Sequence, residues 1–448
     1  MTGERFDAIV IGAGPAGEVV ASRLGEHGLS TALIEQELVG GECAYWACIP
    51  SKTLLRPGEA RVHAERSPGT WGAQTRWSDV AEYRDHMIRN LDDEDEIEGY
   101  EGQGIRVFKG RASLQGPGKV RVGRRTIHGD RLVIATGSEA DIPPIDGLAA
   151  SGYWTNREAT TLIQVPDSAI VLGGGPVGIE LAQMLRRFGA EVDLFESSDS
   201  LLTREDPRVG ELILAAVRDD GIGVHLGTAV VAVTRDGDYR VAHHADGQVQ
   251  ARQVIVAVGR KPRVEGLALE SVGIDPTPTG IPVDERCRAA EGVWAVGDVT
   301  GEMPFTHVAM YQGRIAVADI VGETARANYQ AVPRVLFTDP EVAAVGMTER
   351  EAREASVDVQ TVHLPLRDSI ARPWTYETDP RGELAVIADA RRKTLVGAWA
   401  VGPLVSEWIH YAALAIKAEL PLSLLRDTVA QFPTYTEAYL KAIERLDL

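Results

Sequence analysis

The amino-acid sequence predicts an α/β fold made of two similar βαβ units and a C-terminal region of mixed α and β structure. The first observation is a glycine-rich turn, GAGPAG, between an apolar run at 6–11 and a helical pattern at 18–28. The second is a near copy of that arrangement around GGGPVG at 173–178. The third is a change of sequence pattern at about Asn328, beyond which strand-like runs mix with helical stretches. Three domains are also what a chain of 448 residues leads us to expect.

Each βαβ unit ends its second strand on an acidic residue at the same distance from the turn. Gly12 and Glu35 are 23 positions apart, and so are Gly173 and Glu196. A strand, a GxGxxG turn, a helix and an acid at the end of the next strand form the pattern that binds dinucleotides. The full pattern occurring twice predicts two dinucleotide sites in Rossmann-like domains, and argues against two glycine turns without a ligand.

The glycines of these turns have separate tasks. The first permits the tight turn, the second lets a pyrophosphate approach the backbone, and the third lets the helix pack on the strand. The free N–H groups of the helix N-terminus would bind the phosphates, and Glu35 and Glu196 would accept hydrogen bonds from ribose hydroxyls. The predicted nucleotide-binding glycines are Gly12, Gly14 and Gly17 in the first unit and Gly173, Gly175 and Gly178 in the second.

The second unit interrupts the first domain. A buried strand-like run ends at the Ala135–Gly137 turn, and Gln253–Gly259 is a similar exit. The segment Gly292–Asp298 then returns to the first domain. We therefore expect the first dinucleotide-binding domain at 1–150 and 280–327, the second at 151–279, and the α+β domain at 328–448. In the last domain we expect strands at 334–337, 384–388 and 395–401 and helices at 406–417 and 435–445.

Composition excludes several classes of function. The net charge of −19 repels phosphate backbones, so nucleic-acid binding is not expected. No apolar stretch of about 18 residues occurs, so we expect no membrane span. The N-terminus lacks a basic and then apolar signal pattern, which makes the cytoplasm the expected compartment. Three cysteines are too few for a structural disulfide framework.

Two of the three cysteines, Cys43 and Cys48, lie in the segment GGECAYWACIPSK at 40–52. They follow a Gly-Gly turn near an expected helix start, where the helix dipole favours a thiolate. Two neighbouring thiols of this kind can cycle between dithiol and disulfide. A zinc site would need further cysteine or histidine ligands in matching pairs, and none are seen, so no metal is predicted. The third cysteine, Cys287, is interpreted as a bystander.

The segment at 40–52 resembles the redox-disulfide motif GGxCxxxxCxPSK of the class I pyridine nucleotide–disulfide oxidoreductases. Dihydrolipoamide dehydrogenase, glutathione reductase and mercuric reductase belong to this family. The turn at 135–137, the second glycine turn, Gly297-Asp298 and the stretch 337–341 match in the same order, so the resemblance covers essentially the whole chain. It implies a glutathione reductase-like fold that binds FAD in the first domain and NAD(P)H in the second. It also implies a homodimer formed through the third domain, with each active site completed by the partner subunit.

The resemblance also implies roles for single residues. Cys48, nearer the flavin, would be the charge-transfer thiol, and Cys43 would be the interchange thiol that meets the acceptor. Lys52 would approach the flavin N5 edge and pair with Glu180. Asp298 would bind the ribityl and pyrophosphate region of FAD, and the adenosine ribose would be bound by Glu35. Further cofactor-binding positions implied by the family are Gly41, Thr136, Gly137 and Gly259.

The choice of nicotinamide cofactor depends on Glu196. A carboxylate accepts a hydrogen bond from a ribose 2′-hydroxyl and repels a 2′-phosphate, so NADH is the expected cofactor. Arg204 lies eight positions further along and could reach a phosphate, which leaves NADPH as the alternative.

The chain departs from the family at one catalytic position. The disulfide reductases carry a His-Pro pair near the C-terminus, followed by a Glu that orients the His. Pro433 and Glu437 are in place here, but Phe432 stands at the His position. A phenyl ring cannot transfer a proton, and losing a general acid–base costs about 10²–10⁴-fold in such steps. Mercuric reductases also lack this His but add a C-terminal cysteine pair, which the last residues of this chain do not contain.

The sequence therefore predicts an FAD-dependent NAD(P)H oxidoreductase that reduces a small disulfide or other thiol-reactive acceptor through Cys43 and Cys48. Because of Phe432, we expect the acceptor to differ from that of dihydrolipoamide dehydrogenase. The alternative is a quinone or dye oxidoreductase, or a transhydrogenase-like enzyme, in which the flavin passes electrons on directly.

Overall fold

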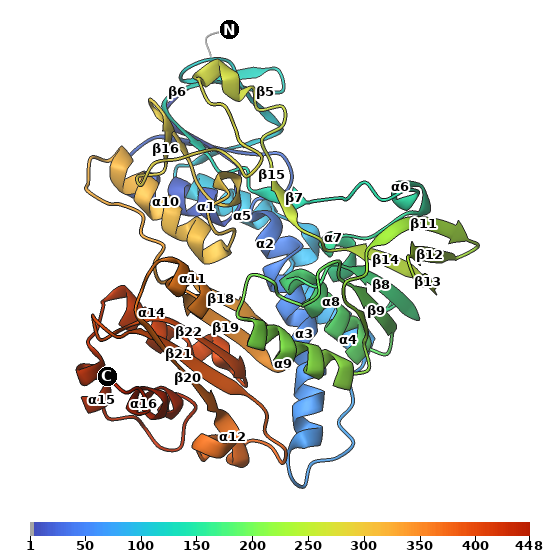
Figure 1. Ribbon diagram of the computed structural model, residues 1–448. Coiled ribbons are helices and arrows are strands. Elements are labelled where there is room, and N and C mark those ends of the chain that lie inside the picture. Colours follow the sequence, from blue (N-terminus) through green and yellow to red (C-terminus); the bar gives the residue numbers. More distant parts are fainter. Residues whose placement is uncertain (1–3) are drawn as a thin grey trace. The chain divides into compact units, whose positions relative to one another are not determined.

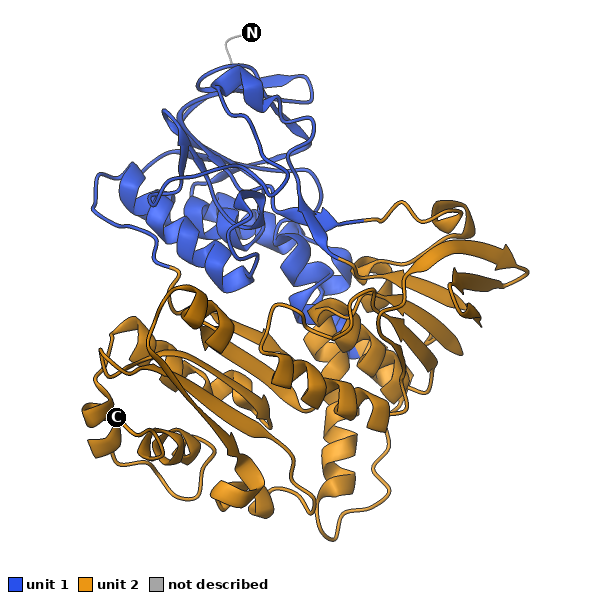
Figure 2. Cartoon of the chain, in the orientation of Figure 1, with its two compact units in different colours: residues 1–50, 83–141, 259–328 blue, residues 51–82, 142–258, 329–448 orange. Residues whose placement is uncertain are grey.

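The computed structural model describes residues 4–448, which fall into two compact units (Figure 2). The first unit comprises residues 1–50, 83–141 and 259–328, and the second comprises residues 51–82, 142–258 and 329–448. The chain therefore leaves the first unit and returns to it twice. The expected division into three domains at 150, 279 and 327 stays a prediction.

The first unit is built on an eight-stranded sheet with β1 (Glu4–Ile11) near its middle (Figure 1). β1 pairs in parallel with β2 (Thr31–Glu35) and β6 (Arg125–Ile134), and the strands run in the order β16-β17-β6-β1-β2-β3. β4 and β5 extend this sheet beside β6. Residues 8–11 of β1 are apolar and buried, because parallel strands at the centre of a sheet are covered on both faces.

Helices of the first unit pack directly on that sheet and on one another. α1 (Pro15–Glu26) follows β1, and α10 (Thr306–Ile320) packs against it so closely that a methyl group on Gly313 would lie 3.1 Å from the Ala16 carbonyl oxygen. The other elements of this unit are α2 (Gly41–Tyr45), η1 (Arg89–Leu91), α5 (Glu94–Gly102), β3 (Arg106–Lys109), β4 (Ala112–Leu114), β5 (Lys119–Val122), β7 (Ser138–Ala140), β15 (Arg260–Pro262), η2 (Leu269–Val272), β16 (Arg288–Ala290), β17 (Val293–Ala295) and η3 (Asp298–Thr300). Two helices, α3 (Cys48–Arg66) and α4 (Trp77–Met87), run through boundaries between the units.

The second unit contains a smaller parallel sheet, ordered β10-β9-β8-β14, which carries the second glycine turn. β8 (Ser168–Leu172) leads through that turn into α8 (Pro176–Arg187), and β9 (Glu191–Phe195) then pairs with β8 in parallel. The remaining elements around it are α6 (Leu148–Ser151), α7 (Asn156–Thr160), α9 (Pro207–Asp219), β10 (Gly223–His225), β14 (Gln253–Val256) and an antiparallel sheet of β11 (Val230–Asp236), β12 (Tyr239–His244) and β13 (Gly247–Ala251).

The C-terminal part of the second unit is a five-stranded antiparallel sheet in the order β18-β19-β22-β21-β20. Every residue of β21 (Glu383–Asp389) is buried, because one face of the sheet packs on the C-terminal helices and the other on the core around α8. The other elements are β18 (Pro333–Leu336), β19 (Glu341–Gly346), α11 (Glu349–Glu354), β20 (Val359–Pro365), α12 (Leu366–Ser369), η4 (Arg372–Thr375), β22 (Thr394–Gly402), α13 (Val405–Trp408), α14 (His410–Lys417), α15 (Leu422–Asp427) and α16 (Glu437–Glu444).

The predicted α/β fold class is confirmed, with small shifts at element ends. The helix expected at 18–28 begins three residues earlier, at Pro15, because proline is well suited to the first position of a helix. The helix after the second glycine turn likewise begins at a proline, Pro176. The single helix expected at 406–417 is wrong, since the structure has two helices there, α13 and α14, with Ile409 between them.

Candidate active site

The first glycine turn is closely packed at the N-terminal end of α1. Gly12 has a φ of +101°, and a methyl group there would lie 2.3 Å from the carbonyl oxygen of Ala135. A methyl group on Gly17 would lie 1.8 Å from the Gly12 carbonyl oxygen, and one on Gly41 would lie 2.7 Å from the Cα of Gly14. Only glycine fits these contacts. The turn therefore presents bare backbone at a helix N-terminus, which is the cradle that a pyrophosphate needs.

The second glycine turn repeats this geometry. Gly173 has a φ of +112°, and a methyl group there would lie 2.4 Å from the carbonyl oxygen of Ala257. A methyl group on Gly178 would lie 2.0 Å from the Gly173 carbonyl oxygen. A methyl group on Gly175, by contrast, would meet nothing within 4 Å, so the space in front of the α8 N-terminus is open. The residues present fit a second dinucleotide.

Each turn is tied to the acid predicted from the sequence. One carboxylate oxygen of Glu35 accepts a hydrogen bond from the Ala13 main-chain nitrogen at 2.8 Å, and one of Glu196 accepts from Gly174 at 2.7 Å. The other oxygen of each acid accepts from the main-chain nitrogen two residues further on, at 2.7 Å in both cases. The two carboxylates are thus fixed beside the glycine turns, where ribose hydroxyls can donate to their remaining lone pairs.

Asp298 lies at the start of η3, where Ser138 holds it. The Ser138 hydroxyl donates to a carboxylate oxygen of Asp298 at 2.6 Å, and Arg260 donates to the hydroxyl and to the main-chain oxygen of Ser138 at 2.8 Å each. The Thr136 hydroxyl donates to the carbonyl oxygen of Arg263 at 2.7 Å. Ser138 and Arg260 were not predicted as site residues, because their contacts join segments more than a hundred positions apart.

The two exit turns that the sequence identified run beside each other within the first unit. β7 and β15, which follow Gly137 and Gly259, pair as antiparallel strands. The carbonyl oxygen of Gly137 accepts a hydrogen bond from Arg263 at 2.9 Å, and that of Gly259 accepts from Asp141 at 3.0 Å. This pairing fixes the positions of the two glycines that the family resemblance implies as cofactor-binding.

Cys43 lies in α2 and Cys48 is the first residue of α3, at the helix end where the dipole favours negative charge. Both side chains are half-buried. The Thr306 hydroxyl oxygen lies 3.3 Å from the sulfur of Cys43 and 3.3 Å from that of Cys48. Thr306 begins α10 and was not predicted, since nothing in the local sequence connects it with a cysteine 258 positions away. The third cysteine, Cys287, is buried apart, and burial raises its pKa to about 12.

The two sulfurs of the pair are not equivalent. A hydrogen bond with Cys48 is the largest cause that raises the pKa of the Cys43 thiol well above its usual value, and burial adds to it. The hydrogen bond from Thr306 opposes the rise. A hydrogen bond raises a thiol pKa when it stabilises the protonated form, so the contact with Cys48 and burial both favour the protonated form of Cys43.

In the second unit, Lys52 and Glu180 form the ion pair that the sequence led us to expect. The Lys52 Nζ lies 2.7 Å from one carboxylate oxygen of Glu180, whose other oxygen accepts from the Phe337 main-chain nitrogen at 2.9 Å. The Lys52 ammonium also lies 4.9 Å from the centre of the Phe337 ring. Glu180 is nearly buried, with 8% of its side chain exposed, whereas Lys52 keeps 35%. Lys52 and Cys48 lie one turn apart on α3.

Two C-terminal candidates lie near the loop that joins α15 to α16. Phe432 is in this loop, and Glu437 is the first residue of α16. Phe432 is 72% exposed, and Val429 in the same loop is 92% exposed. Glu437 begins α16, and its Oε2 is buried without a hydrogen-bond partner among residues 4–448. In the family, this Glu orients a histidine. Here the carboxylate of Glu437 is retained, but the Phe432 ring at the histidine position has no hydrogen-bond donor.

Neither a metal site nor a membrane span is found between residues 4 and 448. Among these residues, no group of three or more His, Cys, Asp or Glu side chains is arranged to hold a metal ion. None of the helices in this part of the chain combines the length and the apolar character that crossing a membrane requires.

Comparison with known proteins agrees with this geometry. Residues 6–313 match the family described as pyridine nucleotide-disulphide oxidoreductase, and residues 332–443 match its dimerisation domain. The chain belongs to this family. It is an FAD-dependent pyridine nucleotide–disulfide oxidoreductase with a redox-active cysteine pair, Cys43 and Cys48. The family, the glutathione reductase-like fold and the cofactors FAD and NAD(P)H are thereby confirmed.

Individual relatives differ in what their names say they act on. A mercuric reductase of Bacillus cereus is 32% identical, over 99% of this chain and 72% of its own length. A dihydrolipoyl dehydrogenase of Thermus scotoductus is 33% identical, over 98% of this chain and 97% of its own. The structure of an HOCl-induced flavoprotein disulfide reductase, RclA, from Escherichia coli is 29% identical and superposes with a TM-score of 0.89, covering 98% of this chain and 100% of its own. At these similar levels of identity, the relatives do not distinguish between acceptors.

Proposed function

We propose that this oxidoreductase passes electrons from NADH through FAD and the Cys43–Cys48 pair to a disulfide or another thiol-reactive acceptor other than lipoamide. The observation that carries the proposal is the sulfur pair itself, with the Thr306 hydroxyl oxygen at 3.3 Å from both sulfurs. When bound, FAD supplies the two-electron exchange between the nicotinamide and the sulfurs. The remaining steps depend on residues of this chain.

The thiol chemistry balances without another reductant. Cys43 loses its proton and attacks one sulfur of a disulfide acceptor, which releases the first thiol and leaves a mixed disulfide on Cys43. Cys48 then attacks the Cys43 sulfur, releases the second thiol and closes the Cys43–Cys48 disulfide. The acceptor has gained two electrons and two protons, and the pair has lost them. The order of attack follows the roles that the family assigns, with Cys43 as the interchange thiol and Cys48 as the thiol nearer the flavin.

Phe432 supports an acceptor that needs no protonated leaving group. In the family the His at this position takes the proton from the interchange thiol and returns it to the leaving thiol. A thiol-reactive metal ion binds the thiolates without releasing a thiol. A disulfide whose thiols are acidic releases its leaving thiolate without that help, since leaving-group ability rises as the thiol pKa falls. The names of two relatives, a mercuric reductase and a Cu(II) complex of RclA, support including Hg²⁺ and Cu²⁺ among the acceptors tested.

Glu196 supports NADH as the electron donor. Both of its carboxylate oxygens accept main-chain hydrogen bonds, so the negative charge is fixed beside the second glycine turn. That charge favours a 2′-hydroxyl and repels a 2′-phosphate. Arg204 is exposed on the segment before α9 and is the residue through which NADPH could bind instead.

The dimerisation domain supports a homodimer in which the partner subunit contributes to the site. An exposed loop carrying Val429 and Phe432 is suited to contact with a second copy, because large apolar side chains exposed together mark interaction surfaces. The small-molecule acceptor would then meet Cys43 beside the partner's Phe432. A cytoplasmic location is in keeping with this chemistry, because reduced thiols persist there.

A second candidate is a quinone or dye oxidoreductase, or a transhydrogenase-like enzyme, in which the flavin reduces the acceptor directly. Phe432 favours this candidate, since an apolar ring suits a planar acceptor and removes the acid–base that disulfide exchange uses. The two candidates differ in their need for Cys43.

An anaerobic steady-state screen separates them. NADH and NADPH are tested against lipoamide, oxidised glutathione, mycothiol disulfide, Hg²⁺, Cu²⁺ and quinones, with the wild-type holoenzyme and with Cys43→Ser. We expect slow turnover of lipoamide and at least one faster thiol-reactive acceptor that Cys43→Ser abolishes. Quinone reduction that Cys43→Ser leaves intact, with no thiol-reactive acceptor turned over, would establish the second candidate. Fast lipoamide turnover would show that the proposal about Phe432 is wrong.

A further inference from the structure

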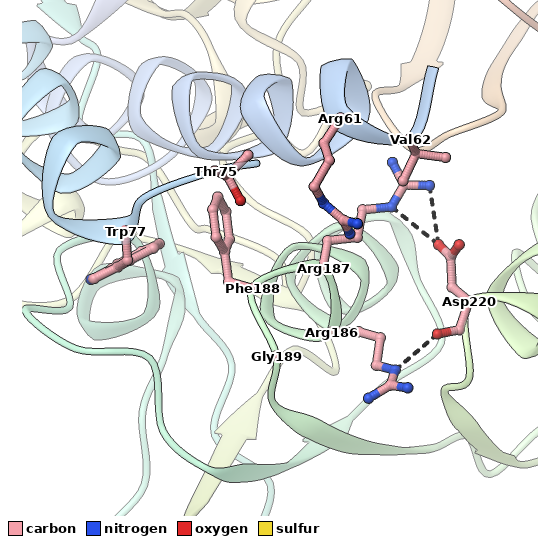
Figure 3. Close-up of a pocket in the computed structure, with 9 residues that line it drawn as sticks. All are labelled: Arg61, Val62, Thr75, Trp77, Arg186, Arg187, Phe188, Gly189 and Asp220. Carbon is pink, nitrogen blue, oxygen red and sulfur yellow. Dashed lines mark hydrogen bonds and ion pairs between the residues drawn. The ribbon is translucent and has the colours of Figure 1, made fainter. Parts of the chain in front are cut away.

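A pocket of about 490 Å³ lies within the second unit, away from the glycine turn of that unit (Figure 3). Its walls come from α3, from the segment before α4, and from the C-terminal ends of α8 and α9. α8 has its glycine turn at the opposite end, and a helix of 12 residues is about 18 Å long. The pocket is therefore distinct from the second dinucleotide site, and its volume is in the range of small-molecule sites.

The pocket has one aromatic and one cationic wall. The rings of Trp77 and Phe188 meet edge to face at 4.9 Å, while Arg61, Arg186 and Arg187 bring three guanidinium groups (Figure 3). Asp220 is the only carboxylate among the lining residues that the structure describes. In a chain with a net charge of −19, this is a local excess of positive charge.

One of these arginines has no anionic partner in the described part of the chain. Arg186 donates from Nε to the Asp220 carbonyl oxygen at 2.8 Å and from Nη1 to the Ala190 carbonyl oxygen at 3.3 Å. No carboxylate of residues 4–448 lies within ion-pair distance of it. The C-terminal end of a helix favours a cation, which accounts for the position of Arg186 but leaves its charge uncompensated by a counterion. Among the described residues, the one carboxylate that pairs with Arg61 is that of the exposed Glu65, at 3.0 Å, and a surface pair of this kind contributes little to stability.

The third arginine is already saturated. Arg187 is almost fully buried and lies 3.1 Å from Asp220 and 2.8 Å from Asp339. It forms the fixed back of the pocket, while Arg186 and Arg61 have N–H groups left to donate. Two available guanidinium groups opposite two aromatic rings match a ligand that has an anionic group at one end and a planar ring at the other.

We propose that this pocket binds a small aromatic anion, a ring bearing a phosphate or carboxylate, with the anionic group on Arg61 and Arg186 and the ring on Trp77 and Phe188. None of the lining residues takes part in the proposed redox chemistry, so the proposal stands whether or not the proposed acceptor is correct.

Calorimetric titration of the FAD-bound enzyme tests the site, with saturating NAD⁺ present so that the second glycine turn is occupied. The probes are phenyl phosphate, inorganic phosphate and phenol, which carry both groups, the anion alone and the ring alone. We expect saturable binding of phenyl phosphate that is at least about tenfold tighter than that of either fragment. We also expect Arg61→Gln and Arg186→Gln to weaken it about tenfold or more, since each removes a hydrogen bond between charged groups.

Arg76→Gln is the matched control, because Arg76 is 78% exposed between two lining residues but does not line the pocket itself. It removes the same charge and should leave binding unchanged. Arg186→Gln also removes two bonds to the main chain, so Arg61→Gln, whose only partner is on the surface, keeps the test valid if the first variant unfolds. Hydrogen exchange gives the location: phenyl phosphate should slow exchange in the segments around Trp77 and Phe188. Three results would each overturn the proposal. They are equal affinity of wild type and Arg61→Gln for phenyl phosphate, slowed hydrogen exchange confined to residues 12–17, and the absence of saturable heat in the titration.

Discussion

The Lys52 ammonium nitrogen lies 2.7 Å from a Glu180 carboxylate oxygen, and the same carboxylate binds the main chain of Phe337. α8 therefore fixes the position of a lysine on α3 and is itself fixed to the C-terminal part of the second unit. Gln183 and Arg187, one and two turns further along α8, bind Asp339 in the same segment. These contacts place Lys52 in a rigid setting, which is what a group that interacts with a developing charge requires.

Replacing Lys52 by methionine should slow the reduction of bound FAD by NADH on the order of a hundredfold, as the loss of one fixed electrostatic partner does elsewhere. Stopped-flow absorbance under anaerobic conditions measures this step alone. Lys119→Met, at an exposed position on β5, removes the same charge and should reduce at the wild-type rate. Equal rates in wild type and Lys52→Met would remove Lys52 from the active site.

Replacing Glu196 by serine should shift the enzyme from NADH toward NADPH. The change removes the negative charge that repels a 2′-phosphate and the acceptor that binds a 2′-hydroxyl, so the ratio of kcat/KM for NADPH over NADH should rise about tenfold or more. Steady-state kinetics with both nucleotides give the ratio. Glu191→Ser, exposed at the start of the same strand, should leave it unchanged. A ratio that stays constant in Glu196→Ser would show that another residue selects the nucleotide.

Replacing Asp339 by asparagine should destabilise the second unit by about 3–5 kcal/mol, because it leaves buried Arg187 with one carboxylate fewer. Burial disfavours the charged form of Asp339, but His63, Arg187 and Arg66 outweigh burial and hold its pKa well below the usual value. Because its pKa is lowered, charged Asp339 stabilises the fold above the ordinary carboxylate pKa, and this stabilisation is lost on acidification. Chemical denaturation measures the change.

The matched control for Asp339 is Asp379→Asn, which breaks an exposed pair with Arg367 and should cost less than about 1 kcal/mol. If both variants lose the same stability, the buried network contributes no more than a surface ion pair.

Glu18→Gln should stabilise the first unit at neutral pH and not in acid. Burial raises the pKa of Glu18 from 4.5 to about 6, against a hydrogen bond from Tyr100 that lowers it. The folded state therefore binds more protons than the unfolded state, so the contribution of Glu18 is full below 4.5 and is lost as the pH rises through about 6. Glutamine does not titrate, so the free energy of unfolding of Glu18→Gln at neutral pH should exceed that of wild type by on the order of 2 kcal/mol.

Thermal unfolding from about pH 5 to about pH 8 measures this difference against the ordinary range of the carboxylate. The melting temperature of Glu18→Gln should rise above that of wild type only at the upper end. Glu101→Gln, on exposed α5, removes the same charge and should follow wild type throughout. A constant difference across the range would mean that Glu18 is not the titrating group.

The parts of the site that follow from local spacing could be predicted from the sequence. The two glycine turns, their acids and the cysteine segment each occupy a short stretch of chain, and their backbone demands are specific enough to exclude other residues. Gly12 and Gly173 illustrate this, since the contacts that forbid a side chain there are nearly identical in both units.

The parts that depend on distant segments could not be predicted. Thr306 contacts cysteines more than 250 positions away, and Ser138 fixes Asp298 from 160 positions away. The sequence identifies Phe432 as a departure from the family. Only the three-dimensional structure shows that it is 72% exposed and that the Oε2 of Glu437 has no hydrogen-bond partner among residues 4–448. Short polar contacts of this kind have no periodic signal, because any serine or threonine can make them once the fold brings it there.

The central claim, that Cys43 and Cys48 have unequal roles in one redox centre, is tested most directly by the absorbance spectrum of the two-electron-reduced enzyme. A thiolate beside the flavin gives a long-wavelength charge-transfer band. Anaerobic titration with NADH should produce this band in wild type, and Cys43→Ser should show it as well, whereas Cys48→Ser should lack it. A band of unchanged strength in Cys48→Ser would show that Cys48 is not the thiolate beside the flavin.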